Sequence, residues 1–207
     1  LDLGFGHCLL AVGDLDLAKA YIERALPVFK SLNASTAEAQ AFNALGVLEE
    51  QQGNRSKATT HLMQALELQQ LVRPPQVKLN IAVLQNLAFV EARNGSGRDA
   101  RTHLLAALPF FISGKSKETP ETLRLLEART YAALGEIYYK LSDAQNADAA
   151  LKKAITLGTA INDDASLWRD YVNLARLQLA QGDQGASKDS LNSALSFFRS
   201  PQAGAFA

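Results

Sequence analysis

The chain has 207 residues, of which 47% are hydrophobic and 20% charged, a composition typical of a globular protein with a large core. Its 21 basic residues balance 21 acidic residues, which excludes the broad positive field expected of a protein that binds nucleic acid or an anionic membrane. No apolar run in the sequence is long enough to cross a bilayer. We therefore expect neither a nucleic-acid nor a membrane partner.

The single cysteine indicates a cellular compartment, and the start of the sequence bears on whether it is part of a longer polypeptide. Cys8 is the only cysteine, so an internal disulfide is excluded and a reducing compartment is favoured; we predict a cytoplasmic location. The sequence begins at Leu1 without a signal-like segment, and its first helical segment is short. We expect it to be a piece of a longer polypeptide.

Segments of helical periodicity alternate with short breaks along the whole chain, and none shows sustained β alternation. The expected helices cover residues 1–12, 15–32, 37–52, 56–72, 76–93, 98–111, 121–141, 144–161, 164–181 and 185–198. The longest irregular piece is 113–120. Residues 199–207 carry Pro201 and Gly204, and we expect a flexible tail or a linker to a missing domain. The pattern predicts an all-α chain.

Two columns of small residues recur through these helices. The first consists of Gly6, Gly46, Ala88, Gly135 and Ala175, and the second, 19 residues later in every copy, of Ala25, Ala65, Ala107, Ala154 and Ala194. A fixed distance between the same residue classes indicates one repeated structural unit. Successive copies are 40, 42, 47 and 40 residues apart, so only the connections between units vary. We predict five repeats, at 1–34, 35–74, 75–113, 119–162 and 163–198, in a single solenoid over 1–198.

The packing of helices explains these columns. Antiparallel helices lie about 8–10 Å apart, and small side chains allow the near end of that range. Large apolar residues share the face of the second column: Ile22, Leu62, Leu104, Leu151 and Leu191. A further small column precedes them: Ala18, Ala58, Ala100, Ala147 and Ser187. Each hairpin then leaves an apolar flank that a neighbouring hairpin must cover, which predicts stacking. Gln69, off this face, is expected to be exposed.

The repeat pattern resembles that of a known family. Repeat two carries Phe42, Leu45-Gly46, Gly53, Ala58, Leu62 and Ala65-Leu66, and repeat four carries Tyr131, Leu134-Gly135, Ala147, Leu151 and Ala154. This pattern resembles the tetratricopeptide repeat (TPR). The period exceeds the usual one of about 34 residues, and in this it is similar to longer-helix variants in motor light chains, polarity adaptors and bacterial signalling proteins. The resemblance implies a right-handed α-solenoid of five stacked helix-turn-helix hairpins.

Three features that could indicate other chemistry have simpler interpretations. Gly114-Lys115-Ser116 matches the end of a phosphate-binding loop, but Pro109 stands where that motif needs glycine and no strand precedes it, so we expect a linker. His61 and His103 occupy one column of successive repeats, too far apart to share a metal at about 2 Å. Trp168 is expected to pack between repeats. We predict no enzyme activity, no catalytic residues, no metal and no cofactor.

The resemblance also implies where a partner binds, because in this family the first helices line a concave face. That face would present Gln40, Asn43, Glu50, Gln85, Asn86, Phe89, Arg93, Arg129, Glu136, Tyr139, Lys140, Arg169, Asn173 and Arg176. Amide side chains there can bind the main chain of an extended peptide. For any single one of these residues, a plain solvated surface is the competing interpretation.

The second half of that face is richer in basic residues than the first. Arg129 and Arg169 fall in one column of successive repeats, and arginine suits the capture of carboxylate or phosphate. We therefore expect a partner with an acidic or phosphorylated stretch across repeats four and five. The alternative is that these arginines pair with local acids such as Asp170, where exposed ion pairs contribute about 0–1 kcal/mol.

The predicted function is that of a scaffold or adaptor module, which binds a partner protein or peptide as part of a larger protein. The alternative is a ligand-sensing or regulatory TPR segment of a bacterial signalling protein or a caspase-like peptidase. The last helix ends in Leu195, Phe197 and Phe198 with nothing predicted to cover them. We expect this edge to dock on a following domain or to support self-association.

Overall fold

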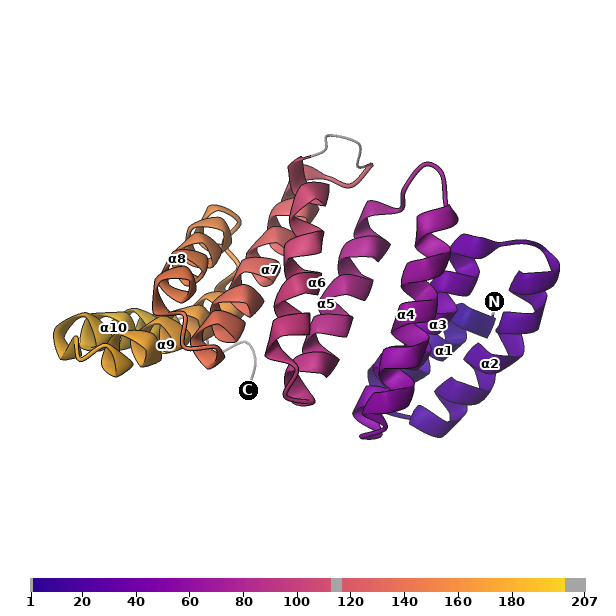
Figure 1. The fold of residues 1–207 in the computed structure, drawn as a ribbon, viewed down its shortest axis with the longest axis horizontal. Coiled ribbons are helices and arrows are strands. Elements are labelled where there is room, and N and C mark those ends of the chain that lie inside the picture. Colours follow the sequence, from indigo (N-terminus) through magenta and orange to yellow (C-terminus); the bar gives the residue numbers. More distant parts are fainter. Residues whose placement is uncertain (1, 113–116, 200–207) are drawn as a thin grey trace. The chain divides into compact units, whose positions relative to one another are not determined.

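The computed structural model describes residues 2–112 and 117–199, and within them the chain forms ten α-helices and no strand (Figure 1). The helices are α1 (Asp2–Val12), α2 (Leu15–Ser31), α3 (Ser35–Gln51), α4 (Arg55–Leu71), α5 (Val77–Arg93), α6 (Gly97–Ile112), α7 (Pro120–Lys140), α8 (Ala144–Ala160), α9 (Asp164–Ala180) and α10 (Gln184–Arg199). Each begins and ends within two residues of its expected range. The all-α prediction is confirmed. The Gly114-Lys115-Ser116 match and most of the expected tail lie outside the described residues.

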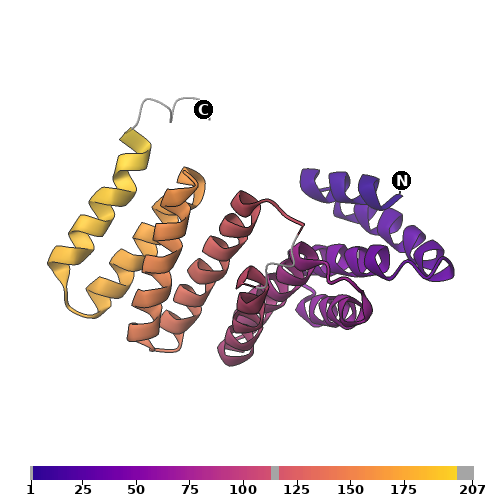
Figure 2. The same ribbon diagram turned by 90° about the horizontal axis from the view of Figure 1, so that it is seen from above.

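The helices form antiparallel hairpins that stack in two compact units, Leu1–Lys117 and Glu118–Ala207 (Figure 2). The first unit holds the hairpins α1/α2, α3/α4 and α5/α6, and the second holds α7/α8 and α9/α10. Between hairpins, α2 packs on α3, α4 on α5 and α8 on α9. These contacts confirm the prediction of stacked helical hairpins. The continuity of one solenoid over 1–198 stays a prediction.

Within each unit, the first helices of the hairpins form a layer of their own. In the first unit α1 contacts α3 and α3 contacts α5, and in the second unit α7 contacts α9. Among the described residues, the second helices of neighbouring hairpins make no such contact with one another. Within each unit, the first helices of neighbouring hairpins therefore pack directly on one another, whereas the described second helices do not.

The column of small residues lies where the two helices of a hairpin approach most closely. A Cβ atom placed on Gly46 would lie 2.5 Å from Cγ of Leu62, and one on Gly135 would lie 2.6 Å from Cγ of Leu151. Both leucines are almost fully buried. Any larger side chain would push the helices apart, since a well-packed core does not absorb extra atoms.

The last hairpin departs from this scheme. The buried Ser187 takes the place of alanine, and its Oγ donates a hydrogen bond to the backbone oxygen of Ala175 at 2.9 Å. Leu191 is 44% exposed, although its counterparts in the other repeats are buried. The Trp168 ring lies 5.5 Å from that of Phe198, a contact within its own hairpin. The expected packing of Trp168 between repeats stays a prediction.

A left-handed residue closes the turn within each hairpin. Four of these turns use glycine with φ between +81° and +84°: Gly13, Gly53, Gly95 and Gly182. Glycine adopts this conformation without the clash that a Cβ atom causes. In the α7/α8 turn, Ser142 takes the position with φ 61°. The turn geometry is therefore imposed by the hairpin even where the sequence does not supply glycine.

Polar groups in the core of the first unit are unevenly satisfied. Glu49 is 1% exposed and accepts hydrogen bonds from Lys19 Nζ at 2.7 Å and Asn54 Nδ2 at 2.8 Å. Burial opposes ionisation of this carboxyl, but the two hydrogen bonds hold its pKa below the ordinary value. Gln69, which was expected to be exposed, is 2% exposed, and its amide nitrogen and oxygen lack partners.

No helix in the described ranges combines the length and apolarity needed to cross a membrane.

Candidate functional site

In the first unit, the candidate residues lie on α3 and α5, and none of them is buried. They are Gln40, Asn43 and Glu50 on α3, and Gln85, Asn86, Phe89 and Arg93 on α5. Asn86 Nδ2 donates a hydrogen bond to Asn43 Oδ1 at 2.9 Å, which ties the two helices together through their amides. Each amide keeps a further donor or acceptor for a ligand.

The charges of this face neutralise each other. Arg93 Nη1 lies 2.8 Å from Glu50 Oε1, and the guanidinium carbon lies 5.5 Å from the centre of the Phe89 ring. Phe89 itself is 53% exposed. The α3–α5 face is thus amide-rich, with one closed ion pair and one exposed aromatic ring.

In the second unit, the candidate residues lie on α7 and α9, and again none of them is buried. They are Arg129, Glu136, Tyr139 and Lys140 on α7, and Arg169, Asn173 and Arg176 on α9. Lys140 Nζ lies 2.8 Å from Glu136 Oε1, one turn away on the same helix. The Arg176 guanidinium carbon lies 5.6 Å from the centre of the Tyr139 ring, which joins α9 to α7.

A pocket of about 400 Å³ opens between α7 and α9. Small side chains leave the space, and charged ones surround it. Its lining consists of Ala128, Arg129, Ala132, Ala133, Glu136, Gly158, Asp163, Ser166, Arg169 and Asp170. The structure thus brings three of the predicted residues, Arg129, Glu136 and Arg169, to one concave site.

The two arginines of the pocket are exposed and keep their charges for a ligand. Arg169 donates a hydrogen bond to the backbone oxygen of Ala165 at 3.2 Å, and its guanidinium carbon lies 5.5 Å from the centre of the Trp168 ring. Over residues 2–112 and 117–199, neither Arg129 nor Arg169 forms an ion pair with an acidic side chain. The alternative expectation, in which they pair with Asp170, is not what the structure shows.

Asp170 itself was not predicted as part of the site. It is 5% exposed, and burial together with the nearby charge of Asp163 raises its pKa to about 7, while Arg169 opposes the shift. Its counterparts in other repeats are Ala41, Val83 and Thr130, all fully buried. A carboxyl in a column of buried, mostly apolar positions is the sequence signal that could have identified it.

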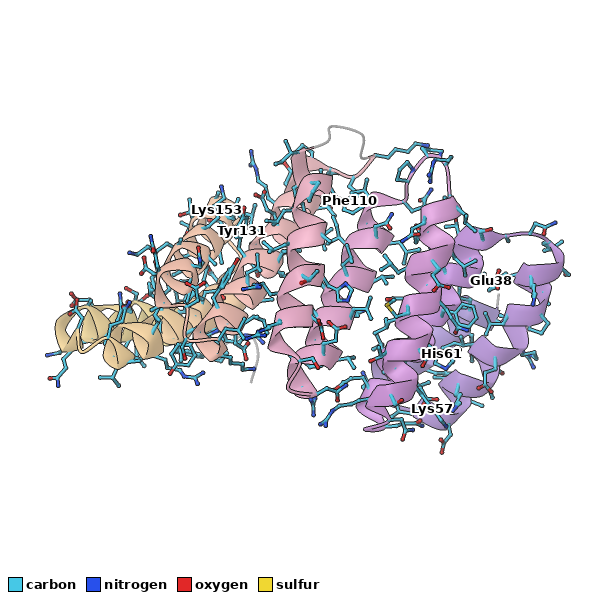
Figure 3. All side chains as sticks on the ribbon, viewed as in Figure 1. Glu38, Lys57, His61, Phe110, Tyr131 and Lys153 are labelled. Atoms are coloured by element: carbon cyan, nitrogen blue, oxygen red, sulfur yellow. The ribbon has the colours of Figure 1, made fainter. Side chains whose placement is uncertain are left out.

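The two repeated histidines have separate local partners. His61 lies on α4 (Figure 3). Its ring stacks on that of Phe42, with 5.9 Å between the ring centres. His103 Nε2 lies 3.1 Å from Glu91 Oε1, and this hydrogen bond raises the pKa of His103 although burial opposes it. Among the described side chains, no group of three or more His, Cys, Asp or Glu converges in a way that could hold a metal ion.

Known proteins with the same architecture are distant in sequence. No curated protein matches the chain. The structure of BtubC (BKLC) from P. vanneervenii matches with a TM-score of 0.79 and 19% identity, over 93% of this chain and 76% of that one. The apo form of RapI matches with a TM-score of 0.84 and 12% identity, over 96% and 69%. A chain of the APC/C hetero-tetramer Cut9–Hcn1 matches with a TM-score of 0.73 and 22% identity, over 98% and 34%.

Two segments of the sequence match models of one family. Residues 1–70, in the first unit, match one model of the tetratricopeptide repeat, and residues 128–157, within α7 and α8, match a second. The matched segments thus fall in both units, and each consists of the helical hairpins described above. Sequence and fold together identify tetratricopeptide repeats in both units of this chain.

Proposed function

We propose that the chain is a protein-interaction module whose first helices bind an extended segment of a partner, and that its second unit receives an acidic or phosphorylated stretch of that segment. The family and the fold support a protein-interaction role in general. The observation that carries the finer proposal is the pair Arg129 and Arg169, which line one pocket without acidic partners in the described part of the chain.

The chemistry of the arginine pair favours an anionic group. A guanidinium presents a planar set of donors that matches a carboxylate or phosphate with two parallel hydrogen bonds. Arg169 is already held by the Ala165 oxygen and the Trp168 ring, so less side-chain entropy is lost when it binds. Glu136 lines the same pocket, but Lys140 balances its charge.

The first unit is suited to a neutral stretch of the same segment. The Asn43–Asn86 amide pair keeps groups that can bind peptide N–H and C=O, and the Glu50–Arg93 pair removes net charge from the face. The Cut9–Hcn1 hetero-tetramer is a protein complex that contains a related fold. By analogy, we propose that the role of this chain is binding rather than catalysis. We also propose a cytoplasmic location.

The test uses fluorescence anisotropy with acidic and phosphoserine-containing dodecamers, at low and moderate salt. We expect the double change Arg129→Glu and Arg169→Glu to weaken binding at least about tenfold, and to flatten the salt dependence. The matched control changes the same net charge on exposed second-helix positions, Lys153→Glu with Lys188→Glu. Equal affinity and salt dependence of the two double variants would refute the proposal.

A further inference from the structure

The pocket between α7 and α9 contains a carboxyl group that the fold does not need. Asp170 is 5% exposed, whereas the equivalent positions in two other repeats hold Ala41 and Val83 at 0%. In the hairpin before it, Thr130 hydrogen-bonds the Leu126 oxygen of its own helix at 2.8 Å. An apolar or self-satisfied side chain therefore suits this position, and a buried carboxyl there costs stability.

Asp170 lines the pocket but has no partner in it. Over the described residues its carboxyl forms neither a hydrogen bond nor an ion pair. Buried polar groups in folded proteins almost always have a partner, and a charged group without one is the costliest exception. The Asp170 oxygens can be reached from the pocket, so a group that enters it can donate hydrogen bonds to them.

Asp163 provides a second, independent observation of a carboxyl oxygen that lacks a hydrogen-bond partner. It precedes α9 at the N-cap position, where an aspartate normally accepts a hydrogen bond from the helix backbone. Asp14 and Asp143 do so, each from a backbone nitrogen at 3.2 Å. Asp163 makes no such bond, and its Oδ2 is buried without a partner on the wall of the pocket. Asp163 and Asp170 are seven residues apart, two turns along one face of α9.

We propose that Asp163 and Asp170 form a subsite for one basic side chain, the ammonium of a lysine or the guanidinium of an arginine, from the segment bound at the arginine pair. This inference rests on the proposed function and adds to it. The bound segment must then carry a basic residue beside its acidic or phosphorylated one, because Arg129 and Arg169 line the same pocket. A segment with acidic residues alone would leave both carboxyls without a donor.

The nature of the cation follows from the geometry. No three metal-ligating side chains converge within the described residues, so the two carboxyls fit an organic cation better than a metal ion. The alanines and Gly158 in the lining leave about 400 Å³, which accommodates a long aliphatic side chain with its charged end. Entry of a cation favours the ionised form of Asp170, so binding should release a proton near neutral pH.

The first experiment reads the subsite directly and needs no peptide. The titration of the Asp170 carboxyl carbon is followed by NMR with n-butylammonium chloride, and with sodium chloride and butan-1-ol as controls. We expect n-butylammonium, and neither of the two controls, to move the midpoint of the Asp170 titration to lower pH. In Asp163→Asn this movement should shrink, whereas the exposed neighbour change Asp164→Asn should leave it intact. An identical midpoint in n-butylammonium and in sodium chloride overturns the proposal.

The second experiment separates this proposal from the proposed function. Acidic dodecamers with one lysine are compared with the same peptides carrying norleucine in its place. We expect the lysine peptides to bind at least about tenfold tighter, and this preference to disappear in Asp170→Asn. If acidic peptides bind through the arginines without any lysine preference, the subsite is wrong and the proposed function stands. If n-butylammonium binds but no acidic peptide does, the subsite stands and the proposed function falls.

Discussion

At the scale of single residues, Asp170 shows how one ionisable group can make stability depend on pH. Its ordinary pKa of 3.8 rises to about 7 in the folded chain, first because of burial and then because of the charge on Asp163. The folded state therefore binds this proton more tightly than the unfolded state. Between these two values, a rise in pH removes stability, and above about pH 7 no further loss follows.

We predict that Asp170→Asn is more stable than the parent chain at pH 8, by on the order of 1–3 kcal/mol, because the amide carries no buried charge. The difference should shrink steadily between pH 7 and pH 4.5, where Asp170 is protonated. Urea unfolding of both chains at pH 4.5, 6 and 8 measures it. A difference that stays constant over this range would show that Asp170 does not titrate as described.

At the scale of one element, α4 contains two neighbouring positions where a leucine should have opposite effects. Ala65 is 0% exposed at a close helix contact, so Ala65→Leu overpacks the core and should cost about 1–3 kcal/mol. Gln69 buries an amide without partners, and Gln69→Leu should raise stability by about 1 kcal/mol, since it removes two unsatisfied polar atoms.

Thermal unfolding of the two variants is compared with that of Gln70→Leu, an exposed change on the same helix that we expect to be nearly neutral. The thermal midpoint should fall in Ala65→Leu and rise in Gln69→Leu. If Gln69→Leu lowers the midpoint as much as Ala65→Leu does, the buried amide has a partner in solution and our account of this position is wrong.

At the scale of the whole molecule, the outer face of α10 is the largest departure from the packing rule of the repeats. Among the described helices α10 packs only on α9, and Leu191, Leu195 and Phe198 are 44%, 46% and 58% exposed. In the other hairpins the equivalent large residue is buried. An uncovered apolar flank of this kind favours association with an equivalent flank.

We predict that the 207-residue chain self-associates through α10 at high concentration. Light scattering over a concentration series should show a rise in mean mass, and Phe198→Ser should suppress it. Ile112→Ser, which removes an apolar group that is 86% exposed in the first unit, serves as the control and should leave the association unchanged. A constant monomer mass at all concentrations would contradict the prediction.

Helix positions and hairpin pairing could be predicted from the sequence because they depend on short-range spacing. The fixed interval between Gly46 and Ala65, repeated in every copy, specifies which helix faces must meet, and each expected helix was found within two residues. None of the candidate residues on the first helices is buried, as their polar composition suggested. Their use in binding stays a prediction.

What the sequence could not reveal depends on contacts between residues far apart along the chain. The burial of Gln69, the exposure of Leu191 and the partnerless carboxyl of Asp170 each depend on which neighbouring helix covers the position, and how closely. Repeat spacing assigns a residue to a face of its own helix but does not measure the space beyond that face. Only the tertiary structure, by setting α7 and α9 about one pocket, placed Asp163 and Asp170 beside Arg129 and Arg169.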